Sequence, residues 1–420
     1  MKTSKLAEGL KGSEIIKIAG EVNALKAQGE VIYNQTIGDF DSSIFPIPQE
    51  LKQEIVSAYH DNQTNYPQAN GMQVLRETVS SYLSANLGLD YASDEILISG
   101  GARPLIYATY QTILDLDDTV LYPVPSWNND AYTYLSRNKA VIIETKPENK
   151  FMPTALDIKP HLQHVNLIAL CSPLNPTGTT FKKEVLLEIS QLIVDENKRR
   201  KSHNLKPLYV LYDQIYWQLT YGETVHYNPV ELVPEMRDYT IFIDGISKAF
   251  AATGVRVGWA FGPVHVINKM KAMLSHIGAW APKAEQIATA SYLQQTSSVL
   301  NYLQHIKEEL NYRLIEFYKG FNTLKEKGFS VQAIEPEAAL YLTVQFDLIG
   351  KRTASGEVLN SIQEVTSYLI NEAKLAIVPF YAFGTSTGSN WFRLSVGTAK
   401  KDDIATIFEL LETALEKLNE

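Results

Sequence analysis

The sequence contains a single cysteine, Cys171, among its 420 residues. One cysteine excludes an intrachain disulfide framework and a metal cluster held by several thiolates. Because Cys171 lies in the apolar run NLIALC, a buried core thiol is expected. Among the eight histidines, His161 and His164 lie three residues apart. They have no third ligand nearby, so they indicate a solvated pair, and no metal is expected.

Long apolar runs are also missing. No stretch approaches the roughly 20 apolar residues that a membrane-spanning helix needs. The N-terminal stretch MKTSKLAEGLKGSE has no apolar segment long enough for a signal peptide. The formal net charge of −9 argues against nucleic acid or an anionic membrane as the main partner. The expectation is a cytoplasmic protein that binds neither nucleic acid nor membrane.

What the chain does contain is a regular alternation of strand and helix patterns. Its composition, 45% hydrophobic and 20% charged, is ordinary for a globular protein with a sizeable core. Alternating strands and helices imply βα units and a mostly parallel sheet. The predicted strands are 95–99, 119–125, 140–145, 166–172, 207–213 and 240–244, with predicted helices at 104–115, 126–138 and 182–198 between them.

The pattern changes after about residue 283. A long helical pattern with one apolar stripe continues to Lys327, and short strands and two helices follow. This is typical of a smaller α+β domain, which the N-terminal segment is expected to join. The sequence therefore predicts a large domain, residues 49–295, and a small domain made of residues 1–48 and 296–420.

Polar and glycine-rich motifs follow four predicted strands at the end where each strand stops. In an open α/β sheet, ligands bind outside the carboxyl ends of the strands. The four motifs are Ser99-Gly-Gly-Ala-Arg103, Asn175-Pro-Thr-Gly178, Asp213 with Tyr216, and Lys248 with Arg256.

Each motif alone has a plain structural explanation. A glycine pair suits an ordinary turn, Asn-Pro starts turns, an aspartate caps helices, and a lysine or arginine is commonly solvated. Together, however, they suit one ligand. The glycine turn before a helix suits a phosphate, Asp213 suits a cationic ring nitrogen, Asn175 and Tyr216 suit a ring oxygen, and Lys248 suits an aldehyde. Pyridoxal 5'-phosphate carries all four groups.

With these residues in view, the chain resembles the class I and II aminotransferases, pyridoxal-phosphate enzymes of the aspartate aminotransferase fold, over essentially its whole length. The stretch SKAFAATGVRVGWAFGP is most similar to bacterial aspartate aminotransferases of the shorter subgroup. The other matching motifs are Ile37-Gly38, Tyr66-Pro67 with Gly71, Leu75-Arg76, Pro125-Ser126-Trp127 and Trp391-Phe392-Arg393-Leu394-Ser395.

The resemblance implies an α/β fold, with a large cofactor-binding domain whose sheet has helices on both faces and a smaller α+β domain. It also implies catalytic roles. Lys248 bonds to the cofactor aldehyde and later moves the proton between Cα and C4′. Asp213 keeps the pyridine nitrogen protonated, Tyr216 and Asn175 contact the phenolic oxygen, and Trp127 stacks on the ring. The implied phosphate-binding residues are Gly101, Ala102, Arg103, Ser247 and Arg256.

Further residues are implied to bind the substrate and a second subunit. Arg393 is expected to bind the α-carboxylate in a two-pronged pair, with Gly38, Asn175 and Trp127 around the substrate. Tyr66 is expected to reach the phosphate of the neighbouring subunit, which makes the enzyme a homodimer.

The implied activity is ping-pong transfer of an amino group from an L-amino acid to a 2-oxo acid, with 2-oxoglutarate as the expected acceptor. An aspartate-like or aromatic donor is expected. β-Lyases, decarboxylases and racemases share these cofactor residues and stay open as alternatives. A non-catalytic ligand-sensing domain is a remoter alternative. A Rossmann oxidoreductase is disfavoured, because no G-x-G-x-x-G follows a predicted strand.

Some positions depart from the family pattern. Many relatives carry a serine three residues before the lysine as a phosphate ligand, whereas this chain has Gly245 there. That contact is therefore either missing or moved to Ser247. The motif that often reads P-x-G-x-F/Y is Pro336-Glu-Ala-Ala-Leu-Tyr341 here, and the methyl group of Ala338 is expected to narrow the site. The segment 384–390, GTSTGSN, is either a substrate lid or a plain loop.

Overall fold

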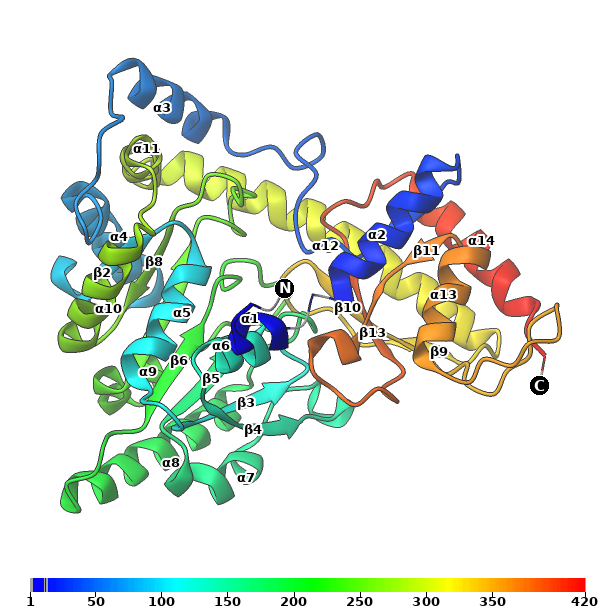
Figure 1. Cartoon of the computed structure of the whole chain (residues 1–420). Coiled ribbons are helices and arrows are strands. Elements are labelled where there is room, and N and C mark those ends of the chain that lie inside the picture. The colour runs from blue at the N-terminus through cyan, green and yellow to red at the C-terminus, as the bar shows by residue number, and fades with distance from the viewer. Residues whose placement is uncertain (1–2, 11, 13, 420) are drawn as a thin grey trace.

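The computed structural model describes residues 3–10, 12 and 14–419. Its largest sheet has seven strands in the order β2-β8-β7-β6-β5-β3-β4, and β8 alone runs opposite to the others (Figure 1). The strands are β2 (Ile96–Ser99), β3 (Thr119–Val124), β4 (Lys139–Glu144), β5 (Leu167–Cys171), β6 (Tyr209–Asp213), β7 (Thr240–Gly245) and β8 (Gly258–Phe261). The predicted mostly parallel sheet is confirmed.

Helices cover both faces of this sheet, which explains why its central strands are apolar without alternation. Every residue of β7 is buried. Phe242 packs into the core on one face, with α4, α8 and α11, while Ile241 and Ile243 pack into the core on the other, with α5 and α10. The helices of this part are α3 (Gln49–His60), α4 (Gln73–Leu87), α5 (Ala102–Ile113), α6 (Asn129–Leu135), α7 (Ala155–Ile158), α8 (Lys183–Ser202), α9 (Pro229–Leu232), α10 (Val264–Ile277) and α11 (Lys283–Leu293).

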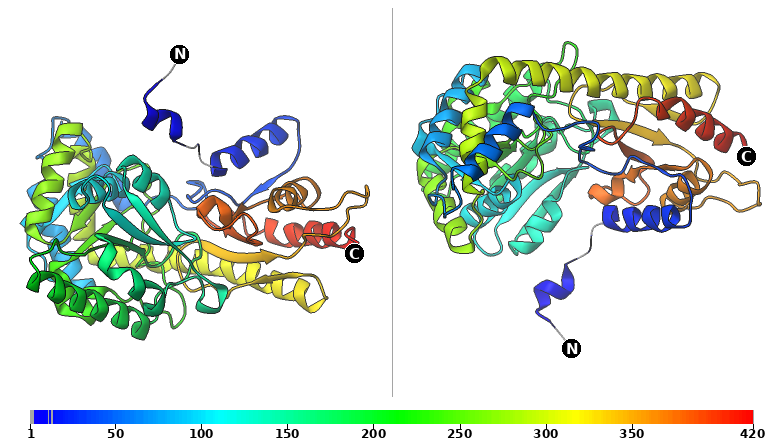
Figure 2. Two further views of the ribbon diagram at one scale, coloured as in Figure 1. Left: turned by 60° about the horizontal axis from the view of Figure 1, so that its bottom comes forward. Right: turned by 90° about the horizontal axis from the view of Figure 1, so that it is seen from above.

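A second core lies around a four-stranded antiparallel sheet, β12-β13-β10-β9, and a two-stranded parallel sheet, β1-β11. The long helix α12 extends from beside α11 to beside α14 (Figure 2). The elements are α1 (Lys5–Gly9), α2 (Glu14–Ala27), β1 (Tyr33–Asn34), α12 (Thr296–Glu326), β9 (Val331–Ala333), β10 (Tyr341–Phe346), α13 (Ile362–Glu372), β11 (Leu375–Ala376), β12 (Val378–Pro379), β13 (Trp391–Ser395) and α14 (Asp403–Glu416). The predicted boundaries between the large and the small domain, at residues 48/49 and 295/296, stay a prediction.

Three local features differ from the sequence expectation. The helical pattern from 283 to Lys327 forms two helices, α11 and α12, which are interrupted at Gln294 and Gln295. The stretch 31–37, VIYNQTI, also has the pattern of a strand, but the strand it forms is only two residues long, because only Tyr33 and Asn34 pair with β11. Strand β8 and helix α10 were not predicted. In the part of the chain that the structure describes, no helix has the length and apolar character to span a bilayer.

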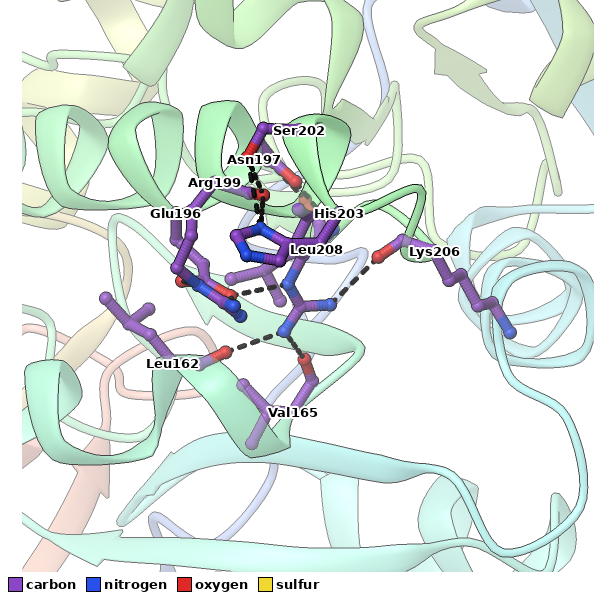
Figure 3. A network of polar contacts seen from close by, with 10 residues as sticks. Leu162, Val165, Glu196, Asn197, Arg199, Ser202, His203, Lys206 and Leu208 are labelled. Atoms are coloured by element: carbon purple, nitrogen blue, oxygen red, sulfur yellow. Dashed lines mark hydrogen bonds and ion pairs between the residues drawn. The ribbon is translucent and has the colours of Figure 1, made fainter.

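A buried arginine on α8 holds together the segments around the start of β5 and β6. The Arg200 guanidinium donates to Glu196 Oε1 at 2.7 Å and to the carbonyl oxygens of Leu162 at 2.7 Å, Val165 at 2.6 Å and Lys206 at 3.1 Å. Figure 3 shows these carbonyl groups converging from separate segments. Only 4% of Arg200 is exposed, so these partners replace the water that the cation loses. These hydrogen bonds fix the segments that lead into β5 and β6 relative to α8.

We expect Arg200→Met to lower the free energy of unfolding by about 3 kcal/mol, because two buried carbonyl groups, a partly buried one and the Glu196 carboxylate lose their donor. The matched control is Arg199→Met. Arg199 donates to the same Glu196, but its side chain is 35% exposed and solvent screens its charge, so its loss should lower the free energy of unfolding far less. Urea unfolding followed by circular dichroism measures both values. Equal losses would contradict the role assigned to Arg200.

Candidate active site

A cavity of about 530 Å³ opens where the carboxyl ends of β5 and β6 face residues from the smaller sheet. This volume suits a cofactor-sized ligand. Most of the predicted site residues line it, whereas Gly101 and Tyr66 do not. The predicted residues in its lining are Gly38, Ala102, Arg103, Trp127, Asn175, Asp213, Tyr216, Ser247, Lys248, Arg256 and Arg393.

One end of the cavity combines the N-terminus of α5 with an arginine. Gly101 precedes the helix with φ 93°, and a Cβ there would lie 2.8 Å from Arg256 Cζ. Arg256 donates to the carbonyl oxygens of Gly100 and Thr253, both at 2.8 Å, so its guanidinium is fixed beside the turn. Free N–H groups and a cation together form a site for an anion such as a phosphate.

Asp213 ends β6 and lies beside Cys171 of β5. Its Oδ1 accepts a hydrogen bond from Ile215 N at 3.1 Å. Burial raises the pKa of Asp213 to about 6, and the Ile215 N–H and the charge of Lys248 oppose that rise. No cation of the described residues forms an ion pair with it. The carboxylate is therefore available to a cationic ligand atom.

Lys248 follows β7, and its ammonium group donates to Gly38 O at 2.6 Å. Burial lowers the pKa of Lys248 to about 8; Asp39 opposes this effect, while Arg393 and Arg103 add to it. A lysine with such a pKa is partly uncharged at neutral pH and can act as a nucleophile or a base.

Arg393 on β13 is buried at the opposite side of the cavity. Its guanidinium donates to Asn175 Oδ1 at 3.0 Å and to Thr36 O at 2.5 Å. Its Cζ lies 4.7 Å from the ring centroid of Tyr341 and 4.9 Å from that of Phe383. Its buried Nε has no hydrogen-bond partner among the described residues. A buried, positioned guanidinium with a donor to spare suits a carboxylate.

The aromatic residues predicted for the site lie in different surroundings. Trp127 lines the cavity, and Arg103 Cζ lies 5.4 Å from its ring centroid. The Tyr216 hydroxyl lies 2.7 Å from the Tyr341 hydroxyl. Tyr66 is 82% exposed and packs edge-on against Trp280 with centroids 5.3 Å apart, outside this cavity. Its predicted contact with a second subunit stays a prediction.

Sequence reasoning missed several residues that line the cavity. Asp39 follows Gly38, Ile15 comes from α2, and Tyr341 begins β10. Asp39 adjoins the Ile37-Gly38 motif and Tyr341 ends the Pro336–Tyr341 motif, but no pattern indicates that their side chains face the cavity. The position of Ile15 depends on how α2 packs, which no local signal reveals.

The departures from the family pattern have a structural basis. A Cβ at Gly245 would lie 2.8 Å from both Gly258 Cα and Val257 O, because β8 approaches closely, so a serine there would require β8 to move. Ala338 is fully buried and pairs with the Asn175–Gly178 turn through Ala338 N and Gly178 O at 2.8 Å.

The segment 384–390 contains GTSTG, which matches the G-x-S-x-G pattern of serine hydrolases. It follows a short 3-10 helix, Phe380–Phe383, and leads directly into strand β13, so it is not the strand–turn–helix of a nucleophile elbow. The Ser386 N–H donates to Glu144 Oε1 at 2.9 Å, which ties the segment to β4. Its role as a substrate lid stays a prediction.

The residues of the cavity fit pyridoxal phosphate. The α5 N-terminus with Arg256 suits the phosphate, the uncompensated carboxylate of Asp213 suits the protonated ring nitrogen, and Lys248, with its lowered pKa, suits the aldehyde. The spare donor of Arg393 suits the carboxylate of an amino acid.

Comparisons with known proteins agree with this geometry. The sequence profile of the family described as aminotransferase class I and II matches residues 34–408. The aspartate aminotransferases of Geobacillus stearothermophilus and Bacillus subtilis are 28% and 27% identical to this chain, covering 100% of it and 98% of each relative. A crystal structure of the aspartate aminotransferase from Rhizobium meliloti superposes with a TM-score of 0.89 at 25% identity, covering 100% of both chains.

The pKa of Lys248 predicts how the cofactor-free protein reacts with pyridoxal phosphate. Only the neutral amine attacks an aldehyde, and a pKa of about 8 means that the neutral fraction rises about tenfold per pH unit below pH 8 and levels off above it. The rate of growth of the visible absorption band, followed by stopped flow from pH 6 to 10, should show that profile. Replacing the exposed Lys269 by alanine should not alter it. A rate that keeps rising to pH 10 would indicate an ordinary lysine.

Proposed function

The chain belongs to the class I and II aminotransferases and is a pyridoxal-phosphate-dependent enzyme acting on amino acids and 2-oxo acids; on that premise, we propose that its amino donor is a dicarboxylic, aspartate-like amino acid and its acceptor is 2-oxoglutarate. The named activity of its relatives, aspartate aminotransfer, supports this choice. The structural observation that carries it is an arginine in the cavity whose guanidinium forms no hydrogen bond or ion pair with the described residues.

That cation is Arg103. Its side chain is exposed to the cavity, and its contact with the described residues is the cation–π approach to Trp127 at 5.4 Å. Arg256 is held by two carbonyl groups beside the turn, and Arg393 by Asn175 and Thr36. If Arg256 serves the phosphate and Arg393 the α-carboxylate, Arg103 is left for a second carboxylate, which both aspartate and 2-oxoglutarate carry.

Aromatic side chains in the cavity favour a second candidate. Trp127 and Tyr341 line it, and Phe383 packs on Arg393, so an aromatic donor would find apolar contacts. Asp39 also lies in the lining and would repel a distal carboxylate that came close. Its carboxylate, however, accepts from Phe40 N at 2.8 Å within its own turn, and its charge acts on Lys248.

The proposed roles of the residues follow from their positions. When bound, pyridoxal phosphate supplies an aldehyde that condenses with amino groups and a ring that takes up the electron pair left by the departing Cα proton. Lys248 takes that proton from Cα and returns it at C4′, which its lowered pKa permits. Gly38 O orients the amine through their hydrogen bond. Asp213 holds the ring nitrogen in its cationic form.

The remaining proposed roles concern binding. Arg393, fixed by Asn175, pairs with the α-carboxylate through two parallel hydrogen bonds. Trp127 covers the ring face. The turn at Gly101 and the first N–H groups of α5, with Ser247 and Arg256, hold the phosphate.

We also propose that the enzyme is a homodimer in which Tyr66 reaches the phosphate of the neighbouring subunit. Tyr66 is largely exposed and packs on Trp280, whose carbonyl oxygen would lie 3.3 Å from a Cβ at Gly100, next to the glycine turn. An exposed aromatic pair at that place supports a subunit contact close to the site. A cytoplasmic location stays a prediction.

The two-carboxylate assignment is tested by comparing Arg103→Met with Arg393→Met. Loss of the Arg103 guanidinium should raise KM for aspartate and glutamate roughly 10- to 100-fold, the worth of a charge-assisted hydrogen bond. KM for an aromatic donor should not change. Loss of the buried Arg393 should raise KM for every donor by roughly 30-fold or more.

The readout is steady-state kinetics on a panel of amino acids with 2-oxoglutarate. Unchanged KM for the acidic donors in Arg103→Met would contradict the dicarboxylic assignment and leave the aromatic donors as the candidate. Release of pyruvate and ammonia without amino transfer would point to a β-lyase instead.

A further inference from the structure

The buried hydroxyl pair of Tyr216 and Tyr341 connects the end of β6 with the start of β10. We propose that Tyr341 is a positioning residue, whose hydroxyl donates to the Tyr216 hydroxyl and thereby leaves the Tyr216 proton for the phenolic oxygen of the cofactor. This inference rests on the proposed function, because it needs Tyr216 to face that oxygen.

The geometry is that of an enclosed hydrogen bond of ordinary length. The two hydroxyl oxygens lie 2.7 Å apart, and the rings meet edge to face with centroids 5.6 Å apart and planes at 70°. Tyr216 is 3% exposed and Tyr341 is 1% exposed, so little water competes for either hydroxyl. Lys248 Nζ lies 5.8 Å from the Tyr216 ring centroid, which places the pair beside the amine.

A phenol has one proton, so the direction of this hydrogen bond matters. If Tyr216 donates to Tyr341, no proton is left for a ligand oxygen. If Tyr341 donates to Tyr216, the Tyr216 hydroxyl accepts from one side and donates on the other. Only the second arrangement allows Tyr216 to stabilise a phenolate oxygen, and the first hydrogen bond then strengthens the second.

The surroundings favour Tyr341 as the donor. The Arg393 guanidinium lies over the Tyr341 ring, with Cζ 4.7 Å from its centroid, and stabilises negative charge on that phenol. Burial raises the pKa of both phenols, and the charge of Arg393 opposes that rise at both. The hydrogen bond between the hydroxyls further opposes the rise at Tyr341 but adds to it at Tyr216, whose pKa lies well above its usual value. The stronger acid of the pair, Tyr341, is the better donor.

The space around the Tyr341 hydroxyl is closed on its other side. A Cβ at Gly38 would lie 2.9 Å from Tyr341 Oη and 3.2 Å from Arg393 Nη1. Gly38 is thus the residue that lets the loop after β1 pass over both groups. Tyr216 is the only hydrogen-bond partner of the Tyr341 hydroxyl among the described residues.

The test is a pH titration of the visible absorption band of the cofactor-loaded protein, in which the cofactor is bound to Lys248. Removing the hydroxyl in Tyr341→Phe should weaken the donor to the phenolic oxygen and raise the titration midpoint by about half to one pH unit. Because the ring under Arg393 remains, KM for amino-acid donors should stay within about twofold.

Two further variants make the test specific. Tyr221→Phe removes another buried hydroxyl from the same core, one that donates to Ala339 O and does not line the cavity, so its midpoint should match the wild type. In a Tyr216→Phe background, adding Tyr341→Phe should cause no further shift, because Tyr341 acts through Tyr216.

Each outcome decides one point. An unchanged midpoint in Tyr341→Phe, or equal shifts with and without Tyr216, would overturn the positioning role while leaving the aminotransferase assignment intact. A wild-type protein that shows no titrating band would instead remove the proposed function on which the inference rests.

Discussion

The burial of the Lys248 amine among other cations is the constraint on which the site depends. Burial lowers its pKa to about 8, and Arg393 and Arg103 act in the same direction. A cavity lined by these groups favours anionic ligands and an uncharged lysine at the same time. The proposed catalytic amine, Lys248, and the proposed carboxylate-binding residue, Arg393, therefore support each other, and replacing either should alter both the affinity for substrate and the reactivity of the amine.

The fold brings these groups together from two separate cores. Parallel strands β5 and β6 bring their carboxyl ends to one edge, which supplies Cys171 and Asp213. The smaller antiparallel sheet supplies Tyr341 and Arg393 from neighbouring strands β10 and β13. Two polar contacts beside the cavity link residues that follow strands of the large sheet to strands of the smaller sheet. These are the Tyr216–Tyr341 hydroxyl pair, between the segment after β6 and β10, and the hydrogen bond from Arg393 of β13 to Asn175, which follows β5. The proposed substrate site therefore lies between the two sheets, where a ligand in the cavity would contact residues from both.

The sequence predicted the parts of this arrangement that leave a local signal. Long buried runs predicted β6 and β7, and polar residues after them predicted Asp213 and Lys248 in the cavity. Strand β8 was missed because GWAF is four residues long and begins with glycine. The break between α11 and α12 was missed because Gln294 and Gln295 do not interrupt the apolar stripe. The cavity-facing side chain of Tyr341 depends on how the two cores dock, which no single segment encodes.

Identification of the lysine that carries the cofactor tests the account most directly. The cofactor-loaded protein is reduced with borohydride, digested, and mapped by mass spectrometry. The account predicts one modified peptide, containing Lys248, and no stable adduct in Lys248→Ala. The exposed Lys269 serves as an internal control for non-specific labelling. A stoichiometric adduct on any other lysine, or an undiminished adduct in Lys248→Ala, would contradict the central claim.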